Sequence, residues 1–558
     1  YLKAINIIGG GTLTMANNMD AATIAVASGS GITLSGNQSM PHANLTLANG
    51  AALMLGTNTL TMNQGGLLTA SLGSQIYIDA ASYLVYGNIQ QSGNASVAAG
   101  TKVFVNETGY IPNGKVLTVV NGAGGSGVLP GVIVTDNDII NTFVPNTVAG
   151  PDLTLTVSAN YNPGNLDSNT QQVANTLQAM EAANDVHEDM ATVLAELHNL
   201  PDAAAVSRAV SQFKPAQGAQ LIDQSFGMMD GGIEAVAAHL GEVRTASLIR
   251  SQGIRDRLDA VNASLDRFEA VEGMSSGEYW TDKEYWAKGL GTQAVQRKAA
   301  GVPGYKTVST GIILGMDILR TDMGVLGLAS GYAFSGTDSD EFNIGQTKIM
   351  HFPLAAYLDI NQQGPWHVNS SLSMAWNVYT ASRTISFGSI NRLATAHYNG
   401  QEFSFYNEAS YDISMKPFTL TPSMFLDYSH LRINQYEESG AGDLDLKVSQ
   451  QNYDRLAPGL GMSVAGAWKL EELVLRPKIR FKWAYDLMAD RAVMSSAFTG
   501  GGPAFQTTGP RPARSSFGLG TGLGIDLPND QSLQFDYDAE MRQNYFASNI
   551  SAMFKSKF

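Results

Sequence analysis

The residue types that catalysis and metal binding require are sparse in this chain and poorly spaced for either. Its 558 residues include no cysteine, which excludes disulfides, thiolate zinc sites and cysteine nucleophiles. The eight histidines are scattered, and His187-Glu-Asp-Met190 lacks the second histidine of a helical zinc pair. Ser30 lies between two glycines in a low-complexity turn and does not form a nucleophile elbow. We therefore expect no catalytic residue, metal site or cofactor among these residues.

The acidic residues do not complete a calcium site. Asp136-Asn-Asp138 begins like a calcium loop, but Asn141 stands where a glycine is required and Thr147 where a bidentate glutamate is required. A solvated turn is the favoured interpretation. The chain has 34 Lys and Arg against 49 Asp and Glu, a net charge of −15, so nucleic-acid binding is not expected.

Two stretches near the C-terminus carry charged residues at alternate positions. Cations alternate with apolar residues between Leu473 and Leu487, and acids do so between Leu533 and Met541. Because successive side chains of a strand point to opposite faces, each strand has one ionisable and one apolar face. We interpret the charges as lining a barrel lumen and pairing with each other and with a polar helix; random lumen polarity is the alternative. They are Arg476, Lys478, Arg480, Lys482, Asp536, Asp538 and Glu540.

The strands that would position these charges form a C-terminal series of twelve alternating segments. Most exceed the 9–11 residues that cross a bilayer, and an even number closes an antiparallel barrel. Short turns alternate with long connections, which we place at 335–346, 382–397, 435–444 and 488–509. The segments lie near 284–298, 304–318, 321–334, 347–360, 365–380, 398–414, 418–434, 445–465, 470–487, 510–527, 530–545 and 546–558.

The N-terminal part of the chain has shorter β-prone runs than the C-terminal segments. Residues 1–110 repeat runs of three to five β-prone residues between Gly and Asn turns, which predicts stacked coils of a parallel β-helix. A β-sandwich is the alternative. The longer runs of residues 111–160 are placed to cap the open edge of such a solenoid.

After residue 160, the apolar residues are spaced as in an α-helix. Val173, Leu177 and Met180 begin an apolar stripe that predicts an α-helical linker over 161–250. The next segment, Ile254–Glu272, is polar on nearly every face and about 28 Å long as a helix, close to a membrane thickness. We therefore predict a lumen helix within 251–277, followed by the barrel over 278–558.

Several motifs resemble those of classical (type Va) monomeric autotransporters, over most of residues 111–558. Trp286-Ala-Lys-Gly-Leu-Gly291 is similar to the first-strand signature, and Gly311-Ile-Ile-Leu-Gly-Met-Asp317 with Gly327-Leu-Ala-Ser-Gly-Tyr332 to the next hairpin. Tyr436-Glu-Glu-Ser-Gly-Ala-Gly442 resembles the Glu-x-Gly-Ala loop. The stretch from Val116 to Thr156 is similar to the segment that caps passenger β-helices and assists their folding.

The resemblance implies a mainly β fold: a right-handed parallel β-helix passenger stem, an α-helical linker and a 12-stranded antiparallel transmembrane β-barrel with a helix in its lumen. It implies type V secretion, in which the barrel sits in the bacterial outer membrane, exports its own N-terminal passenger and anchors it at the cell surface. The expected partners are outer-membrane lipid, the β-barrel assembly machinery and periplasmic chaperones, and the expected state is a monomer.

Two sets of site residues follow from the resemblance. Phe558, with Phe554, Ile550 and Phe546 on the same face, is similar to the terminal signal read by the assembly machinery. Self-cleaving relatives are cut between paired asparagines, whereas here Asn262 is followed by Ala263, so cleavage at this bond is not expected.

The passenger's role is less determined. We expect an adhesive or structural stem whose ligand the sequence does not identify. A hydrolase upstream of Tyr1 is the alternative, since we expect the chain to be the C-terminal part of a longer protein. An ordinary porin is disfavoured because it leaves the residues before the barrel unexplained.

Overall fold

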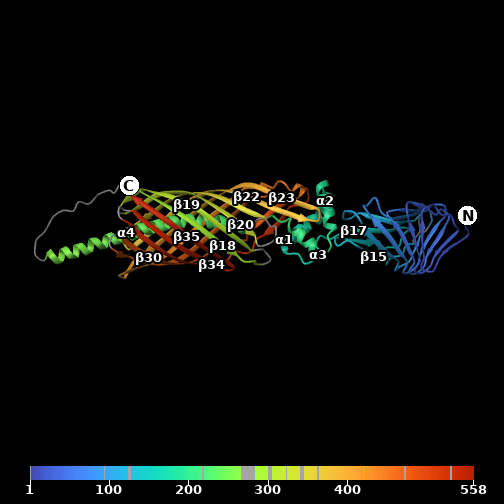
Figure 1. Cartoon of the computed structure of the whole chain (residues 1–558), viewed down its shortest axis with the longest axis horizontal. Helices are drawn as coiled ribbons and strands as arrows, with labels where there is room; N and C mark the ends of the chain where they lie inside the picture. The colour runs from blue at the N-terminus through green and yellow to red at the C-terminus, as the bar shows by residue number, and fades with distance from the viewer. Residues whose placement is uncertain are drawn as a thin grey trace.

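A computed structural model describes residues 2–93, 95–122, 127–215, 219–265, 283–299, 304–321, 323–339, 345–360, 364–415, 417–470, 473–489, 491–527 and 531–557. For residues 219, 245–265, 339 and 557 it describes the backbone alone. Figure 1 shows an elongated molecule with a β-solenoid at the N-terminal end, a helical segment in the middle and a β-barrel at the other end. Among the described helices, none combines the length and hydropathy needed to cross a membrane.

The solenoid has three sheets in which the strands of successive coils pair in parallel, which confirms the predicted parallel β-helix over the sandwich. Ile32, Leu53, Ile76 and Val103 align across neighbouring coils and are fully buried, so each short strand adds to one continuous core. The sheets are β1 (Ile5–Ile7), β3 (Thr23–Val26), β6 (Asn44–Leu47), β9 (Leu67–Ala70) and β12 (Ser96–Val97); β2 (Thr12–Met15), β4 (Gly31–Leu34), β7 (Ala52–Gly56), β10 (Gln75–Ala80), β13 (Lys102–Glu107) and β15 (Ile133–Asp136); and β5 (Gln38–Ser39), β8 (Thr59–Met62), β11 (Asn88–Gln91), β14 (Val116–Asn121), β17 (Leu153–Ala159) and β16 (Asn141–Pro145).

The end of the solenoid nearest the helices is closed by a change of strand direction. β14 still runs parallel to β11, but β17 pairs antiparallel with β14 and with β16. This places an antiparallel hairpin over the edge of the third sheet.

Three short helices, which we call the helical cap, join the solenoid to the barrel. They are α1 (Ser168–Ala182), α2 (Glu188–His198) and α3 (Ala203–Ser211), and the Asp167 carboxylate begins α1 by accepting hydrogen bonds from the backbone N–H groups of Asn169 and Thr170. Their apolar faces share one core with Tyr161 of the solenoid end and with Ile385 and Phe498 of the barrel extensions. The stem and the barrel are therefore held against a common hydrophobic centre.

The barrel is a closed sheet of twelve antiparallel strands, as predicted. Its outward side chains are apolar and exposed and its inward ones polar and buried: Met374 is 58% exposed, whereas Ser373 is 4% exposed. The strands are β18 (Glu284–Gln296), β19 (Tyr305–Thr321), β20 (Gly324–Ser339), β21 (Gln346–Ile360), β22 (Trp366–Phe387), β23 (Ile390–Tyr411), β25 (Phe418–Ile433), β28 (Gln451–Gly466), β30 (Leu473–Tyr485), β33 (Ser515–Leu527), β34 (Gln531–Arg542) and β35 (Tyr545–Lys557), with β24 (Ile413–Met415) and β29 (Trp468–Leu470) at their ends.

The connections at the capped end differ from those predicted. The expected loop 382–397 is a continuation of β22 and β23, which pair up to a tight turn at Gly388. This hairpin extends beyond the barrel because the helical cap supports it: Arg392 pairs with Asp189 of α2 at 2.6 Å. The other extensions form a small sheet of β26 (Tyr436–Glu437), β27 (Leu446–Val448), β31 (Val493–Phe498) and β32 (Phe505–Thr508), beside the 3-10 turn η1 (Gly442–Leu444). We call this the long-loop end and the opposite one the short-turn end.

The helix in the lumen is not the predicted segment. α4 (Ala219–Leu265) is one continuous helix whose side chains between Leu221 and Val243 pack inside the barrel. The later part of α4 extends beyond the short-turn end in Figure 1. The predicted lumen placement is therefore wrong for residues 254–265, and residues 266–277 of the predicted lumen segment lie outside the described residues. Uniform polarity was the wrong criterion, because a helix packed against a barrel wall needs an apolar face and small residues as well.

Candidate functional site in the barrel lumen

The lumen segment of α4 has two different faces. Ile233, Val236, Leu240 and Val243 are buried against the barrel wall. The adjoining face presents Asp223, Gly227, Asp230, Gly231 and Glu234 to a cavity of about 780 Å³, which Ile233 also lines and which is bounded by strands that include β28, β30, β33 and β34. Because these positions recur at helical spacing, one wall holds the helix while space remains along its acidic side.

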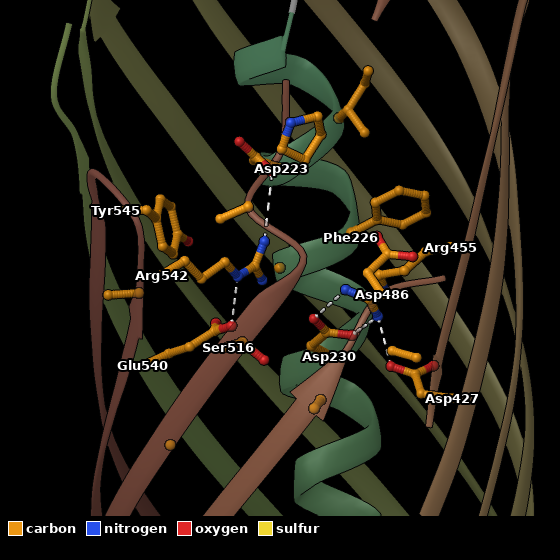
Figure 2. A pocket seen from close by; sticks show the side chains of 18 of the residues that line it. Asp223, Phe226, Asp230, Asp427, Arg455, Asp486, Ser516, Glu540, Arg542 and Tyr545 are labelled. Carbon is orange, nitrogen blue, oxygen red and sulfur yellow. Dashed lines mark hydrogen bonds and ion pairs between the residues drawn. The ribbon is translucent and has the colours of Figure 1, made fainter. Parts of the chain in front are cut away.

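Ion pairs join the acidic side of α4 to the wall (Figure 2). The Arg455 guanidinium donates to Asp230 of α4 at 2.8 Å and to Asp427 of β25 at 2.8 Å. Arg542 lies between Glu540, at 2.6 Å, and Asp223 of α4, at 3.8 Å. Each of these two cations thus has one acidic partner on the wall and one on the helix. This arrangement fixes the helix without leaving a buried charge unpaired.

A buried histidine anchors the same helix nearer the short-turn end. His239 is fully buried, and its Nε2 lies 2.9 Å from an Asp317 carboxylate oxygen that also accepts a 2.7 Å hydrogen bond from the Tyr357 hydroxyl. The imidazole stacks on Trp286 with ring centroids 5.0 Å apart. Sequence reasoning missed this contact, because a lone histidine inside a helical stretch carries no signal of its partner on a distant strand.

One strand is shaped to let charges meet across it. The inward positions of β33 are Gly518, Gly520, Gly522 and Gly524, and a Cβ at Gly520 would collide with the Asp538 carboxylate. With no side chains in the way, Arg480 of β30 reaches over β33 to Asp536, at 3.0 Å, and Asp538, at 2.8 Å, both on β34. The alternating glycines were a readable signal that the sequence analysis did not use.

The charges predicted for the lumen are all inside the barrel. Arg480 pairs with the predicted acids Asp536 and Asp538, but the helix partners of Arg476 and Lys482 lie outside the segment predicted for the lumen. Arg476 pairs with Glu242 of α4 and, at 2.6 Å, with Asp526. Lys482 lies 3.8 Å from Glu234 of α4. Glu242 and Glu234 both lie in the part of α4 that the sequence analysis assigned to the linker over 161–250. Asp536 also pairs with Lys288, at 3.5 Å.

The remaining predicted residues lie at the two termini of the barrel segment. Phe546, Ile550 and Phe554 project outward from β35 and are 44%, 68% and 42% exposed, while Phe558 lies outside the described residues. β35 pairs along its length with β18, so this face belongs to the strand that closes the barrel. The backbone of Asn262 and Ala263 is helical, near the C-terminal end of α4.

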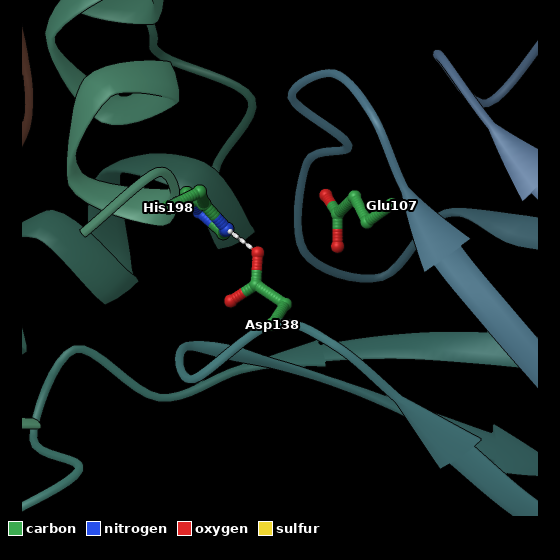
Figure 3. A group of neighbouring side chains, drawn as sticks. All are labelled: Glu107, Asp138 and His198. Carbon is green, nitrogen blue, oxygen red and sulfur yellow. Dashed lines mark hydrogen bonds and ion pairs between the residues drawn. The ribbon is translucent and has the colours of Figure 1, made fainter. Parts of the chain in front are cut away.

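A second cluster lies where the solenoid meets the helical cap (Figure 3). His198 of α2 lies with Nδ1 2.7 Å from Asp138, whose other carboxylate oxygen accepts hydrogen bonds from the backbone N–H groups of Ile140 and Asn141. Glu107 faces the same pair from the end of β13 and accepts a 3.0 Å hydrogen bond from the Asn141 side chain. The expectation of a solvated turn at 136–138 is wrong for Asp138, whose side chain is 3% exposed.

Burial shifts the pKa values of the acidic side chains in the joint where the solenoid meets the helical cap. Burial, helped by the charge of Asp138, raises the pKa of Glu107 to about 9. Burial opposes ionisation of Asp138 too, but hydrogen bonds from His198 and the backbone outweigh it and lower the pKa of Asp138. Glu107 therefore holds a proton at neutral pH beside an ionised Asp138.

Among the described residues, two groups of side chains bring potential metal ligands together. Glu107, Asp138 and His198 bring ligand atoms within 4.8 Å of one another, and so do His239, Glu284 and Asp317 in the lumen. In the lumen group Glu284 already pairs with Arg320 and Lys555, so its charge is balanced without a cation. In the joint the same atoms are engaged in hydrogen bonds. Neither group is assigned a metal.

Comparison with known proteins identifies the class of the barrel. Residues 285–538 match the family model described as autotransporter beta-domain. The chain is 25% identical to outer membrane protein B of Rickettsia conorii over 97% of its own length and 32% of that protein's, and 22% identical to an extracellular serine protease of Serratia marcescens over 60% of this chain and 31% of the protease. The chain thus spans about a third of the length of the curated relatives it matches.

Among solved structures, the chain is similar to the translocator domain of the autotransporter NalP from Neisseria meningitidis. It is 16% identical, covers 56% of this chain and 97% of that one, and has a TM-score of 0.40. The barrel of this chain is an autotransporter β-domain. With its β-solenoid stem, the chain is an autotransporter of the classical kind, located in the bacterial outer membrane with the stem at the cell surface.

Proposed function

We propose that this chain exports its own N-terminal passenger through the outer membrane and keeps it tethered at the cell surface. The observation that carries the proposal is the path of α4. It begins beside the helical cap and passes through the lumen, where its acidic side chains pair with cations of the wall. It then reaches the short-turn end, where β18 begins and β35 ends. The stem and the barrel termini thus lie on opposite sides, joined by one covalent strand of chain.

Display on intact cells tests this proposal. An epitope tag before Tyr1, behind a secretion signal, should be digested by protease added to intact cells expressing the full chain. A matched chain lacking residues 545–557, whose barrel cannot close between β35 and β18, should keep its tag protected. Protection of the tag in the full chain, with a heat-modifiable barrel in the outer membrane, would refute export.

The passenger is proposed to be adhesive or structural rather than catalytic. The described solenoid face is made of short Thr- and Asn-rich strands, and its buried acids are engaged in the joint with the helical cap. The resemblance to a serine protease over 60% of the chain favours the alternative, a barrel whose upstream passenger carries a hydrolase. Binding of the purified chain to host-cell surfaces and hydrolysis of a casein substrate separate the two.

Insertion is proposed to depend on the β-barrel assembly machinery, periplasmic chaperones and surrounding lipid, with the protein acting as a monomer. The outward Phe546, Ile550 and Phe554 on the closing strand support recognition of that strand. A single chain closes the barrel by itself, which supports the monomer.

With Ala263 after Asn262, the passenger is proposed to stay attached; a fragment beginning at Ala263 in washed membranes would refute this.

A further inference from the structure

The space beside α4 is divided into two chambers. A smaller cavity of about 80 Å³, which we call the inner chamber, lies further along α4 from the larger one. The two share Glu234, Lys482, Arg480 and Asp538, which form a layer of ion pairs between them. α4 lines one side of the inner chamber, and strands of the barrel wall that include β28 and β30 line the others.

The charges that line the inner chamber do not balance. Its cations come from three elements and its acids are fewer, and every one of those acids already has a partner: Glu234 pairs with Lys482, Asp538 with Arg480, and Glu408 accepts a 3.1 Å hydrogen bond from the Tyr406 hydroxyl. The cations are Arg244, Lys288, Lys478, Arg480 and Lys482; the acids are Glu234, Glu408 and Asp538.

Lys478 is the cation with the least compensation. Among the described residues, no carboxylate lies within the 4.0 Å ion-pair distance of its Nζ, whereas Lys288 has Asp536 at 3.5 Å and Arg244 has Asp412 at 3.9 Å. The ammonium lies against Gly241 of α4, where a Cβ would come within 3.1 Å of it. A glycine at this position leaves room for a cation to point into the chamber rather than away from it.

The rest of the lining can also donate hydrogen bonds. Asn369, Ser423 and Ser463 contribute one amide and two hydroxyls, whereas the Thr421 hydroxyl already donates to Asp412. A cavity needs only about 10–15 Å³ to hold a water molecule, so 80 Å³ holds several waters or one small polyatomic ion. An uncompensated ammonium away from bulk water is costly, and an anion beside it offsets that cost.

We propose that the inner chamber binds one small inorganic oxyanion of the phosphate or sulfate class, held by Lys478 with help from Lys288, Arg244 and the hydroxyls. This goes beyond export, since it assigns the assembled barrel a ligand. A lipid phosphate is excluded as the source because the chamber lies inside the barrel, between α4 and inward residues of β28 and β30.

Calorimetry on the refolded full chain in detergent, titrated with inorganic phosphate at constant ionic strength in chloride, tests the proposal. Unmodified protein should bind one phosphate, and Lys478→Gln should weaken binding at least about tenfold, or about 1.4 kcal/mol. Lys306→Gln removes an exposed charge from β19 and should bind like the unmodified chain.

A second variant covers the case in which Lys478→Gln fails to fold. Ser463→Asp places a carboxylate in the chamber, opposite Arg480 in register, and should remove phosphate binding while keeping a heat-modifiable barrel. Absence of binding to unmodified protein, or unchanged affinity in either folded variant, would overturn the assignment. Export is not involved in this measurement, so its outcome is independent of the proposed function.

Discussion

At the scale of single residues, Arg480 holds the barrel wall together where three strands meet. It crosses the glycines of β33 to two acids of β34, one of which, Asp536, is fully buried at its side chain. Removing one partner of a buried pair costs more than the pair itself contributes, because the remaining charge stays buried. The stability of the wall should therefore depend on this one guanidinium.

Arg480→Met should destabilise the folded barrel by about 3–5 kcal/mol. The midpoint of urea unfolding, followed by the heat-modifiable gel shift, measures the loss. Lys447→Met is the matched control, since Lys447 and Glu437 form an exposed pair whose side chains are 60% and 57% accessible, and should change the midpoint little. Equal midpoints for the two variants would show that Arg480 is only one of many interchangeable lumen charges.

A second residue-scale prediction concerns Phe558, which we expect from sequence to end the assembly signal. A charge at the membrane interface costs only about 0–1 kcal/mol. Phe558→Asp should therefore refold in detergent like the unmodified chain but give less heat-modifiable barrel in cells. Phe418→Asp, at an outward position 44% exposed where β25 begins, is the control for a lipid-facing phenylalanine outside the signal. Equal yields of both variants in cells would remove the special role of Phe558.

At the scale of elements, the joint between the solenoid and the helical cap is a network of buried acids around one imidazole. Asp138 and Glu107 come from the solenoid, whereas His198 comes from α2 and Glu181 from α1. Tyr161 from the solenoid end lies 3.3 Å from the other nitrogen of His198, and Tyr110 donates to Glu181. Burial raises the pKa of Glu181 as it does that of Glu107, so both favour the protonated form.

This network makes the joint sensitive to alkaline pH. Between the ordinary pKa of Glu107, 4.5, and its folded value of about 9, the folded joint binds one more proton than the unfolded chain, so its stability falls as pH rises. Hydrogen-exchange protection of the Ile140 and Asn141 amides, corrected for intrinsic rates, should decrease from pH 6 to pH 9. Glu107→Gln should flatten that decrease, and Glu188→Gln, on the exposed start of α2, should not. An unchanged pH dependence in Glu107→Gln would contradict the assignment.

The lumen helix gives the second element-scale prediction. Deleting residues 221–243 should raise single-channel conductance in planar bilayers by a large factor, because these residues fill the lumen. Deleting 254–265, which lie beyond the barrel, should leave it nearly unchanged. If deleting 254–265 raised the conductance more than deleting 221–243, the lumen placement expected from the sequence would be restored.

These elements also show what sequence could and could not predict. The twelve strands and their lumen faces were predictable because side chains alternate between the two faces of a strand. Once the apolar side chains face the lipid, Arg476 and Asp536 must face the lumen. A helix in the lumen was predicted, but the segment that forms it was not, since the fit of Gly231 and Ile233 matters only once a wall is present. The joint was not predictable either, because Glu107, Asp138 and His198 are far apart in sequence and are brought together by solenoid coils of unequal length.

At the scale of the whole molecule, the order of elements along the chain is also their order in space. The solenoid, the helical cap and the barrel with α4 in its lumen follow one another from one end of the structure to the other (Figure 1). Only α4 connects the stem, outside, with the strand that begins the barrel. Tethered display by a single chain therefore requires that α4 remain in the lumen after export.

A disulfide between the helix and the wall tests this requirement most directly, since the chain has no cysteine of its own. Gln224 of α4 donates a 2.6 Å hydrogen bond to Ser335 of β20, and both are buried. In cells whose stem is protease-accessible, Gln224→Cys with Ser335→Cys should form an intramolecular cross-link in most of the displayed protein, and neither single variant should. Displayed stem without a cross-link, with both cysteines reactive after unfolding, would contradict the account.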